Sequence, residues 1–167
     1  EDLGLAVDFI NAMSADGSTE PAKRFYKYGR PWRWDSDVFV VPALEPAKSG
    51  SAGTDGGFPS GHTAEAWRDG LAMAYLVPER FQEILTRSVE IGDSRIIAGM
   101  HSPLDVIGGR MLGTATVVYN LNLEDNAELK STARAQVLDW LYRQTGTETE
   151  AELYTAAHAW PLTDDRF

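Results

Sequence analysis

The feature of this sequence that most constrains its fold is an apolar pattern with helical spacing. In five segments the apolar side chains return every three or four residues, as they do along the buried face of an amphipathic α-helix. A sixth and shorter segment near the end of the chain also has helical character. These patterns predict helices at residues 3–13, 67–75, 81–89, 104–118, 129–141 and 148–160. We therefore expect an all-α fold, a compact helical bundle.

Proline and glycine indicate where several of these helices begin or end. Pro78 follows the second helix and suits the first turn of the third, where a missing N–H costs no helical hydrogen bond. Gly146 is expected to close the fifth helix, and Pro161 to stop the terminal one. These residues support the boundaries drawn from the apolar pattern.

One long stretch, residues 32–58, departs from the helical pattern. Its prolines and glycines disfavour regular secondary structure. The only β-rich run in the chain, residues 38–41, lies inside it. A loop of this length in a compact domain is usually functional or disordered. We expect one long irregular loop that lies over or beside the functional site. Trp32 and Trp34 are candidates for the rim of that site, with packing in the core as the alternative.

Length and charge restrict the class of protein. The chain has 167 residues, 43% of them hydrophobic, and is expected to form a single domain over residues 1–167. Its formal net charge of −10 argues against nucleic acid or an anionic membrane as a general partner. No stretch approaches the roughly 20 apolar residues of a membrane-spanning helix. We expect a soluble protein with no integral membrane segment.

Two further observations concern processing and covalent chemistry. The chain contains no cysteine, which excludes disulfides, thiol catalysis and thiolate metal sites. It starts at Glu1 without a basic segment followed by an apolar one, so a signal peptide is expected to be absent or already removed.

The segment Pro59-Ser60-Gly61-His62 has the character of an anion-binding turn. It leads from a glycine-rich stretch into a helix that should begin near His62. Backbone N–H groups at the start of a helix are unpaired and carry the positive end of the helix dipole. Gly61 lets the backbone come close to a ligand, and Ser60 adds a hydroxyl donor. The alternative is plain helix capping by Ser60, with a surface histidine beside it.

A second segment, from Ser94 to Asp105, repeats this arrangement before another helix. Ser102, Pro103 and Asp105 have the order of an N-cap, a first-turn proline and a third-position carboxylate. His101 lies four residues before Asp105, so the two side chains could meet. A carboxylate bonded to one imidazole nitrogen leaves the other nitrogen as a basic nucleophile. The alternative role of Asp105 is to complement the helix dipole.

Three cations, Lys23, Arg30 and Arg95, supply positive charge. Arginine matches phosphate oxygens in bidentate fashion, whereas lysine acts as a point charge. Each of these residues alone would be interpreted as a solvated surface charge. Together with two histidines and an anion-binding turn, they favour a site for phosphoryl transfer.

The spacing of these residues resembles the signature of a superfamily that joins type 2 phosphatidic acid phosphatases, bacterial non-specific acid phosphatases and vanadium haloperoxidases. The signature has three blocks, Lys-six-Arg-Pro, Pro-Ser-Gly-His and Ser-Arg-five-His-three-Asp. All of its positions are filled in order from Lys23 to Asp105, and the resemblance covers roughly residues 23 to 113.

The resemblance implies how the phosphate is held. Lys23, Arg30 and Arg95 would bind its oxygens, assisted by Ser60 and the backbone amide of Gly61.

The resemblance also implies the chemistry. His101 would attack phosphorus and carry a phosphohistidine, oriented by Asp105. His62 would protonate the leaving oxygen and then activate water. The chain is therefore expected to be a metal-independent phosphatase acting on small phosphomonoesters, with no cofactor and no metal site.

A vanadate-dependent haloperoxidase is the alternative function, because vanadate occupies the same cradle in that branch, coordinated by the equivalent of His101. The haloperoxidases are usually much longer, and the membrane-bound phosphatases span the bilayer with several helices, so this chain is nearer to the soluble acid phosphatases. It is short even for those, which is compatible with an N-terminal portion that is missing or processed away. Those relatives suggest a periplasmic or secreted location, whereas the motifs leave the natural ester and the oligomeric state open.

Overall fold

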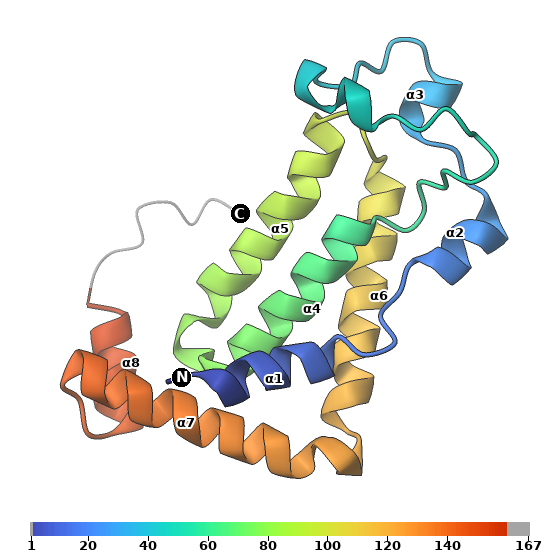
Figure 1. Cartoon of the computed structure of the whole chain (residues 1–167). Helices are drawn as coiled ribbons and strands as arrows, with labels where there is room; N and C mark the ends of the chain where they lie inside the picture. The colour runs from blue at the N-terminus through green and yellow to red at the C-terminus, as the bar shows by residue number, and fades with distance from the viewer. Residues whose placement is uncertain (1, 160–167) are drawn as a thin grey trace.

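The computed structural model describes residues 2–159, and this part of the chain is built from helices and loops (Figure 1). The all-α prediction is confirmed. No strand forms within residues 2–159, so the β-rich run at 38–41 is part of the irregular loop. No helix in that range is both long and apolar enough to span a lipid bilayer. The α-helices are α1 (Gly4–Met13), α2 (Glu20–Tyr26), α3 (Pro31–Trp34), α4 (Gly61–Leu76), α5 (Phe81–Ile97), α6 (Pro103–Leu121), α7 (Ala127–Thr145) and α8 (Glu150–Ala157), and the 3₁₀ turns are η1 (Pro42–Ala47), η2 (Pro78–Arg80) and η3 (Glu124–Asn126).

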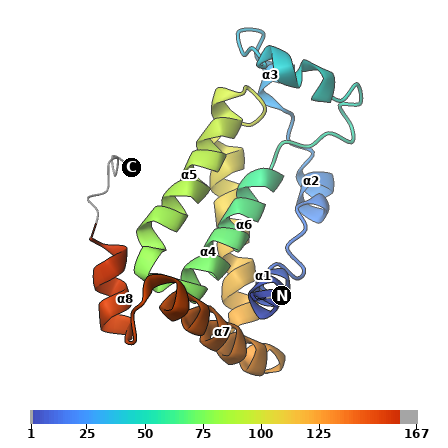
Figure 2. The same ribbon diagram turned by 60° about the vertical axis from the view of Figure 1, so that its left-hand side comes forward.

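Three long helices, α4, α5 and α6, form the centre of the fold. The helix α4 packs against both of the others, and the three stand side by side in Figures 1 and 2. Glycines bring α6 close to α4. A Cβ at Gly109 would lie 2.6 Å from the backbone oxygen of Ser60, and one at Gly113 would lie 2.6 Å from that of Ala64. Any larger residue at either position would push the two helices apart.

The directions of these three helices bring two helix starts and one helix end together. The helices α4 and α6 begin, and α5 ends, at the same end of the bundle (Figure 1). We call this the loop end, because α2, α3, η1 and the irregular loop gather there. The helices α1 and α7 cross the opposite end, which we call the base end (Figures 1 and 2). Two helix N-termini, each with a positive dipole end, therefore point toward the loop end.

The main apolar core lies at the base end. Phe9 and Met13 of α1 are fully buried there, with Val117 of α6 and with Ala133 and Val137 of α7. Full burial of one large apolar side chain stabilises a fold by about 1.5–3 kcal/mol. The base end thus holds the larger apolar cluster of the described chain.

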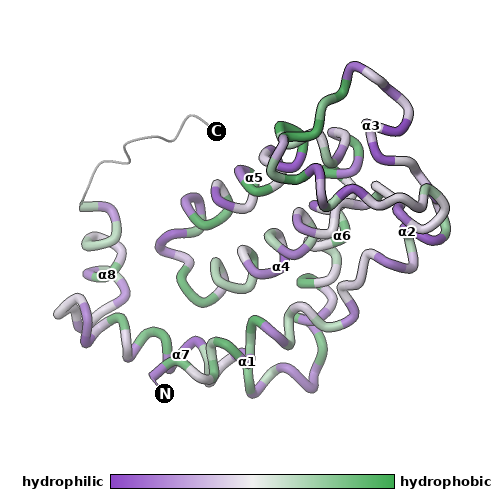
Figure 3. Tube along the Cα trace, turned by 45° about the horizontal axis from the view of Figure 1, so that its top comes forward, coloured by the Kyte–Doolittle hydropathy of each residue, from purple (hydrophilic) through white to green (hydrophobic). Residues whose placement is uncertain are grey.

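A smaller apolar cluster lies at the loop end. Val40 of the loop packs there with Ala98 and Met100, which follow α5, and Trp32 packs against the cluster. An apolar run of the loop is visible beside the end of α5 in Figure 3. Trp32 therefore follows the core-packing alternative, whereas Trp34 is 57% exposed.

The irregular loop is fixed to the end of α5 by its backbone. Val41 donates its N–H to the carbonyl oxygen of Ala98 at 3.2 Å. Gly99 has a φ of +72°, and a Cβ at this position would lie 2.2 Å from the carbonyl oxygen of Phe39. Glycine is required here both for the left-handed backbone and for the close contact. The loop is therefore held in place next to the residues that lead into α6.

Side chains and glycine set the helix boundaries largely as expected. The hydroxyl oxygens of Ser60 and Ser102 accept hydrogen bonds from backbone N–H groups in the first turns of α4 and α6. Gly146 ends α7 in a left-handed conformation. Pro161, which was expected to stop the last helix, lies outside the described residues.

The structure differs from the expected helices in two places. Pro78 begins the 3₁₀ turn η2, and α5 itself begins at Phe81. The helix α2 was not predicted, because none of its side chains is buried and its sequence has no apolar stripe. A short helix of this kind leaves no periodic signal in the sequence.

Candidate active site

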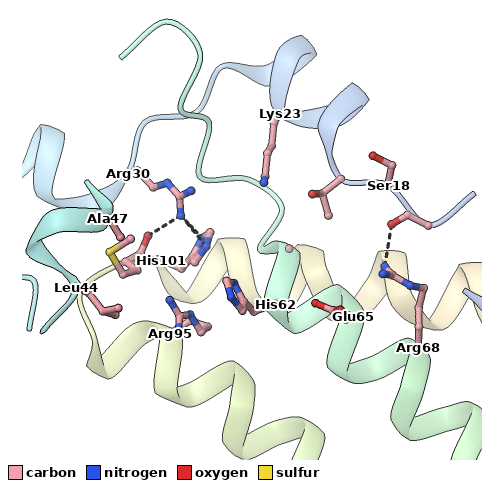
Figure 4. A pocket seen from close by; sticks show the side chains of 14 residues that line it. Ser18, Lys23, Arg30, Leu44, Ala47, His62, Glu65, Arg68, Arg95 and His101 are labelled. Atoms are coloured by element: carbon pink, nitrogen blue, oxygen red, sulfur yellow. Dashed lines mark hydrogen bonds between the residues drawn. The ribbon is translucent and has the colours of Figure 1, made fainter. Parts of the chain in front are cut away.

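A cavity of about 640 Å³ opens at the loop end (Figure 4). Most of the residues predicted for the functional site line it, and they come from α2, α4, α5 and the segments before α3 and α6. They are Lys23, Arg30, Gly61, His62, Arg95 and His101. Leu44 and Ala47 of η1 also line the cavity, so the irregular loop lies beside it as predicted. The other two predicted residues, Ser60 and Asp105, are fully buried and are not part of its lining.

The start of α4 forms the floor of the cavity. The Ser60 hydroxyl accepts hydrogen bonds from the N–H and the hydroxyl of Thr63, at 3.4 and 2.9 Å. The hydroxyl therefore caps the helix, and its predicted contact with phosphate stays a prediction. Gly61 lies on the cavity surface, where a Cβ would point toward the Lys23 ammonium at 3.7 Å. A side chain at 61 would occupy space between the helix start and a cation.

The glycines that precede Ser60 let the chain pass close to two other site residues. A Cβ at Gly56 would lie 3.0 Å from the Cβ of Lys23, and one at Gly57 would lie 3.0 Å from Oδ2 of Asp105. The segment therefore packs against both residues with almost no free space. This contact is a local reason for two consecutive glycines.

His101 and Asp105 form a buried pair at the start of α6. The distance from His101 Nδ1 to Asp105 Oδ2 is 3.4 Å. The same carboxylate oxygen accepts the backbone N–H of Ser102 at 2.8 Å, while Ser102 caps α6 in return. Asp105 thus does both things that the sequence allowed: it belongs to a capping box and it faces the histidine.

The second ring nitrogen of His101 faces Arg30. Arg30 Nη1 lies 2.7 Å from Nε2 and 3.5 Å from Nδ1, and it also donates to the Met100 carbonyl at 3.1 Å. A guanidinium can only donate, so the short contact requires a lone pair on Nε2. A neutral imidazole with its proton on Nδ1, toward Asp105, satisfies both neighbours. Nε2 then carries the lone pair on the cavity side of the ring.

Burial and charge both favour neutral histidines in this cavity. Burial lowers the pKa of His101, and Arg30 acts in the same direction, whereas the hydrogen bond that the ring donates to Asp105 raises it. Burial also lowers the pKa of His62, with Arg95 adding to this effect and Glu65 opposing it. Both rings therefore lose their proton more readily than a free histidine.

The three cations reach the cavity from separate segments, and each is held differently. Lys23 of α2 forms an ion pair with Glu20 at 3.0 Å. Arg30 forms one with Asp55 of the irregular loop at 3.1 Å. Arg95 of α5 has a buried Nε without a hydrogen-bond partner within residues 2–159, and burial lowers its pKa, followed by the charge of Arg30. A cluster of positive charge with an unpaired buried donor is suited to bind an anion.

Some residues of this site were not predicted. Glu65 and Arg68 line the cavity from α4, three and six residues after His62. Their helical spacing from His62 could have identified them, since residues three apart share a helix face. Asp55, which also binds Arg33 at 3.0 Å, lies in the irregular loop and had no such signal.

Side chains that could coordinate a metal ion occur throughout the described chain, including this cavity. No group of three or more histidine, aspartate or glutamate side chains in the described part of the chain is arranged to hold a metal ion.

Comparison with known proteins gives one family. The sequence model of one family, the PAP2 superfamily, matches residues 5–127, a wider range than the three motif blocks cover. The non-specific acid phosphatase of Salmonella typhi is 36% identical over 96 residues, which are 58% of this chain and 37% of that protein. The non-specific acid phosphatase of Providencia stuartii is 31% identical over 117 residues, 70% of this chain and 44% of that protein. The chain therefore spans less than half the length of these relatives. Because the family model covers most of its length, the chain belongs to the PAP2 superfamily.

Proposed function

We propose that this chain is a metal-independent phosphatase that hydrolyses phosphomonoesters through a phosphohistidine on His101. The observation that carries the proposal is the setting of His101: Nε2 lies 2.7 Å from Arg30 Nη1 and Nδ1 lies 3.4 Å from Asp105 Oδ2, in a cavity that Lys23 and Arg95 also line. Relatives named non-specific acid phosphatases support the same reaction class.

Binding of the phosphate group is the first step. Lys23, Arg30 and Arg95 would neutralise its oxygens, and the backbone N–H groups at the start of α4 would add the helix dipole. The Arg30 Nη1 hydrogen bond to Nε2 would pass to a phosphate oxygen, which leaves the Nε2 lone pair free. Positioning and charge stabilisation supply most of the catalysis in phosphoryl transfer.

The chemistry then proceeds in two displacements. His101 Nε2 forms a bond to phosphorus as the ester P–O bond breaks, and His62 donates a proton to the departing oxygen. His62 next accepts a proton from water as the water oxygen attacks phosphorus and the P–N bond breaks. Phosphate leaves and both histidines return to their initial state. Asp105 stabilises the positive ring of the intermediate and keeps the Nδ1 proton in place.

The charge of the substrate would adjust His62 for its role as an acid. Burial lowers the pKa of His62, and the neighbouring cations lower it further. A phosphate dianion would offset those cations and raise the pKa when the substrate binds. His62 would therefore carry its proton when the substrate is bound and a leaving group has to be protonated.

The test is hydrolysis of p-nitrophenyl phosphate in the presence of a chelator, beside a halide and peroxide assay with added vanadate. Turnover of the ester without metal is the expected result. Loss of activity in chelator that a divalent ion restores would contradict the metal-independent reaction. Halide oxidation without ester hydrolysis would instead support the vanadate-dependent alternative.

Vanadate should also act as an inhibitor of the phosphatase. It can adopt the five-coordinate geometry of the transition state and should bind more tightly than phosphate, in competition with the ester. A periplasmic or secreted location remains part of the proposal, to be tested by cell fractionation.

A further inference from the structure

The cavity is larger than a phosphate group needs, and its two ends differ. Beside Arg30 and His101 it is lined by Leu44, Ala47 and Met100. Beyond His62 it is lined by Glu65 and Arg68 of α4, with residues 17–19 on the other wall. Figure 4 shows His101, His62, Glu65 and Arg68 following one another along the cavity.

The geometry of phosphoryl transfer determines which end receives the leaving group. The nucleophile and the leaving oxygen lie on opposite sides of phosphorus. If His101 attacks and His62 protonates the leaving oxygen, as proposed above, the alcohol must extend past His62. It then enters the end of the cavity that contains Glu65 and not the apolar end beside His101.

The charged residues at this end are not equivalent. Arg68 Nη1 donates to the carbonyl oxygen of Gly17 at 2.8 Å, so its guanidinium joins α4 to the opposite wall. Glu65 forms no hydrogen bond or ion pair with another side chain among residues 2–159. It is also the only acidic residue in the described lining of the cavity. The group that is free to meet the alcohol is a carboxylate.

The position of Glu65 fits the length of a small alcohol. It follows His62 by three residues on α4, which places their Cβ atoms about 5–6 Å apart. A proton donor on the second carbon of the alcohol would come within reach of its carboxylate.

We propose that Glu65 selects phosphomonoesters whose alcohol carries a hydrogen-bond donor, an ammonium or a hydroxyl, on its second carbon. This inference rests on the proposed function, because it uses the direction of displacement from His101. A substrate of this class has a negative phosphate, which matches the three cations of the cavity. It also has a hydrogen-bond donor on its alcohol, which matches the carboxylate of Glu65. An alkyl ester would leave the carboxylate without a partner.

Three esters of equal chain length test the proposal: 2-aminoethyl, 2-hydroxyethyl and propyl phosphate. We expect kcat/KM to fall in that order, with the first about 10-fold above the last, mainly through KM. Because Glu65 is exposed to solvent, the preference for the ammonium should weaken as salt is added.

Substitutions at Glu65 separate charge from hydrogen bonding. Glu65→Gln should remove most of the ammonium preference and keep part of the hydroxyl preference, whereas Glu65→Ala should bring all three esters within about twofold of propyl phosphate. The matched control is Glu128→Gln, an exposed glutamate in the first turn of α7, which should keep the wild-type order. An unchanged order in Glu65→Ala would overturn the proposal.

Two further measurements isolate this role. If Glu65 acted only by raising the pKa of His62, its loss would shift the pH profiles of all three esters equally and leave their ratios unchanged. Equilibrium binding of 3-aminopropylphosphonate and butylphosphonate needs no turnover. We expect the amine to bind about 10-fold more tightly to the wild type and equally to Glu65→Ala. Equal binding to the wild type would overturn the role of Glu65, whereas failure to hydrolyse any ester would overturn the phosphatase itself.

Discussion

At the base end, α1 and α7 bury Phe9, Met13 and Val137 in an apolar core, whereas the loop end buries His101 and Asp105 around a cavity. The core needs only shape and apolar surface to be stable. The cavity holds cations close together and includes the buried Nε of Arg95, which has no hydrogen-bond partner in the described chain. We infer that the base end stabilises the fold, whereas the loop end tolerates unfavourable buried polar groups because the proposed reaction needs them.

The sharpest test of this division is to remove the nucleophile. His101→Ala should lower kcat by about 10⁴-fold or more, because no other group can form the covalent intermediate. The melting temperature should change little, since Asp105 keeps its hydrogen bond from the Ser102 N–H and Arg30 keeps the one that it donates to the Met100 carbonyl. Phosphopeptide mapping after quenching in base, in which phosphohistidine is stable, should find phosphate on His101 of the wild type only. Phosphate on His62 or Ser60 would contradict the assignment, and His158→Ala, at an exposed histidine, is the matched control.

Removing His62, the proposed general acid, should affect alkyl and aryl esters differently. His62→Ala should slow alkyl esters by about 10²–10⁴-fold, the usual contribution of general acid–base catalysis. Activated aryl esters need less protonation, so they should still form the phosphohistidine and then stall before hydrolysis. Rapid-quench measurement of the phosphoenzyme checks this. An equal loss for aryl and alkyl esters would show that His62 does something other than protonate the leaving group.

Asp105 belongs to both the fold and the site, so its substitution tests whether these roles separate. Asp105→Asn keeps an oxygen that can accept the Ser102 N–H and should preserve the cap of α6. It removes the charge that holds the Nδ1 proton of His101, and kcat should fall by about 10²-fold. Activity and urea unfolding are measured together. A large loss of stability without a change in kcat would assign Asp105 to capping alone.

The base end should respond in the opposite way. Val137→Ala removes two methyl groups from the core and should lower the free energy of unfolding by about 2 kcal/mol. The activity per folded molecule should stay at the wild-type value. Val118→Ala is the matched control, because Val118 is 54% exposed on α6 and should cost far less. A loss of kcat in folded Val137→Ala would show that the two ends are coupled.

The smallest expected effect is on the pH dependence of stability. The pKa of His101 is lowered below its ordinary value of 6.5, so the unfolded chain binds a proton more readily than the folded chain. Stability from the neutral ring is therefore complete above that value and is lost as the pH falls below it. The slope cannot exceed about 1.4 kcal/mol per pH unit for one proton. Urea unfolding at several pH values should show a shallower loss in His101→Ala than in the wild type.

How much of this was predictable from the sequence depends on whether a residue lies in a periodic element. The apolar pattern located the long helices, and serine and glycine marked several of their ends, as at Ser60 and Gly146. The helix α2 carries Lys23 but buries no side chain, so the pattern that identifies helices was missing. The turn at Pro78 is 3₁₀ and not α-helical, a distinction that a proline signal does not make.

The site follows the same rule. The motif blocks identified the residues that meet in the cavity, because helix starts and helix ends bring them to one end of the bundle. Glu65 could have been found by counting along α4 from His62. Asp55 could not, since its contact with Arg30 depends on the path of an irregular loop. The sequence also left open whether the Ser60 hydroxyl faces a ligand, and the structure uses it to cap α4.

The glycine contact between α6 and α4 has a consequence for how variants of this protein will be interpreted. Gly109 is not part of the described cavity lining, yet a methyl group there would collide with the carbonyl oxygen of Ser60, next to the start of α4. The collision would move His62 relative to His101. In a screen that scores activity alone, Gly109 would therefore look like a member of the reaction centre, although it only sets the spacing between two helices.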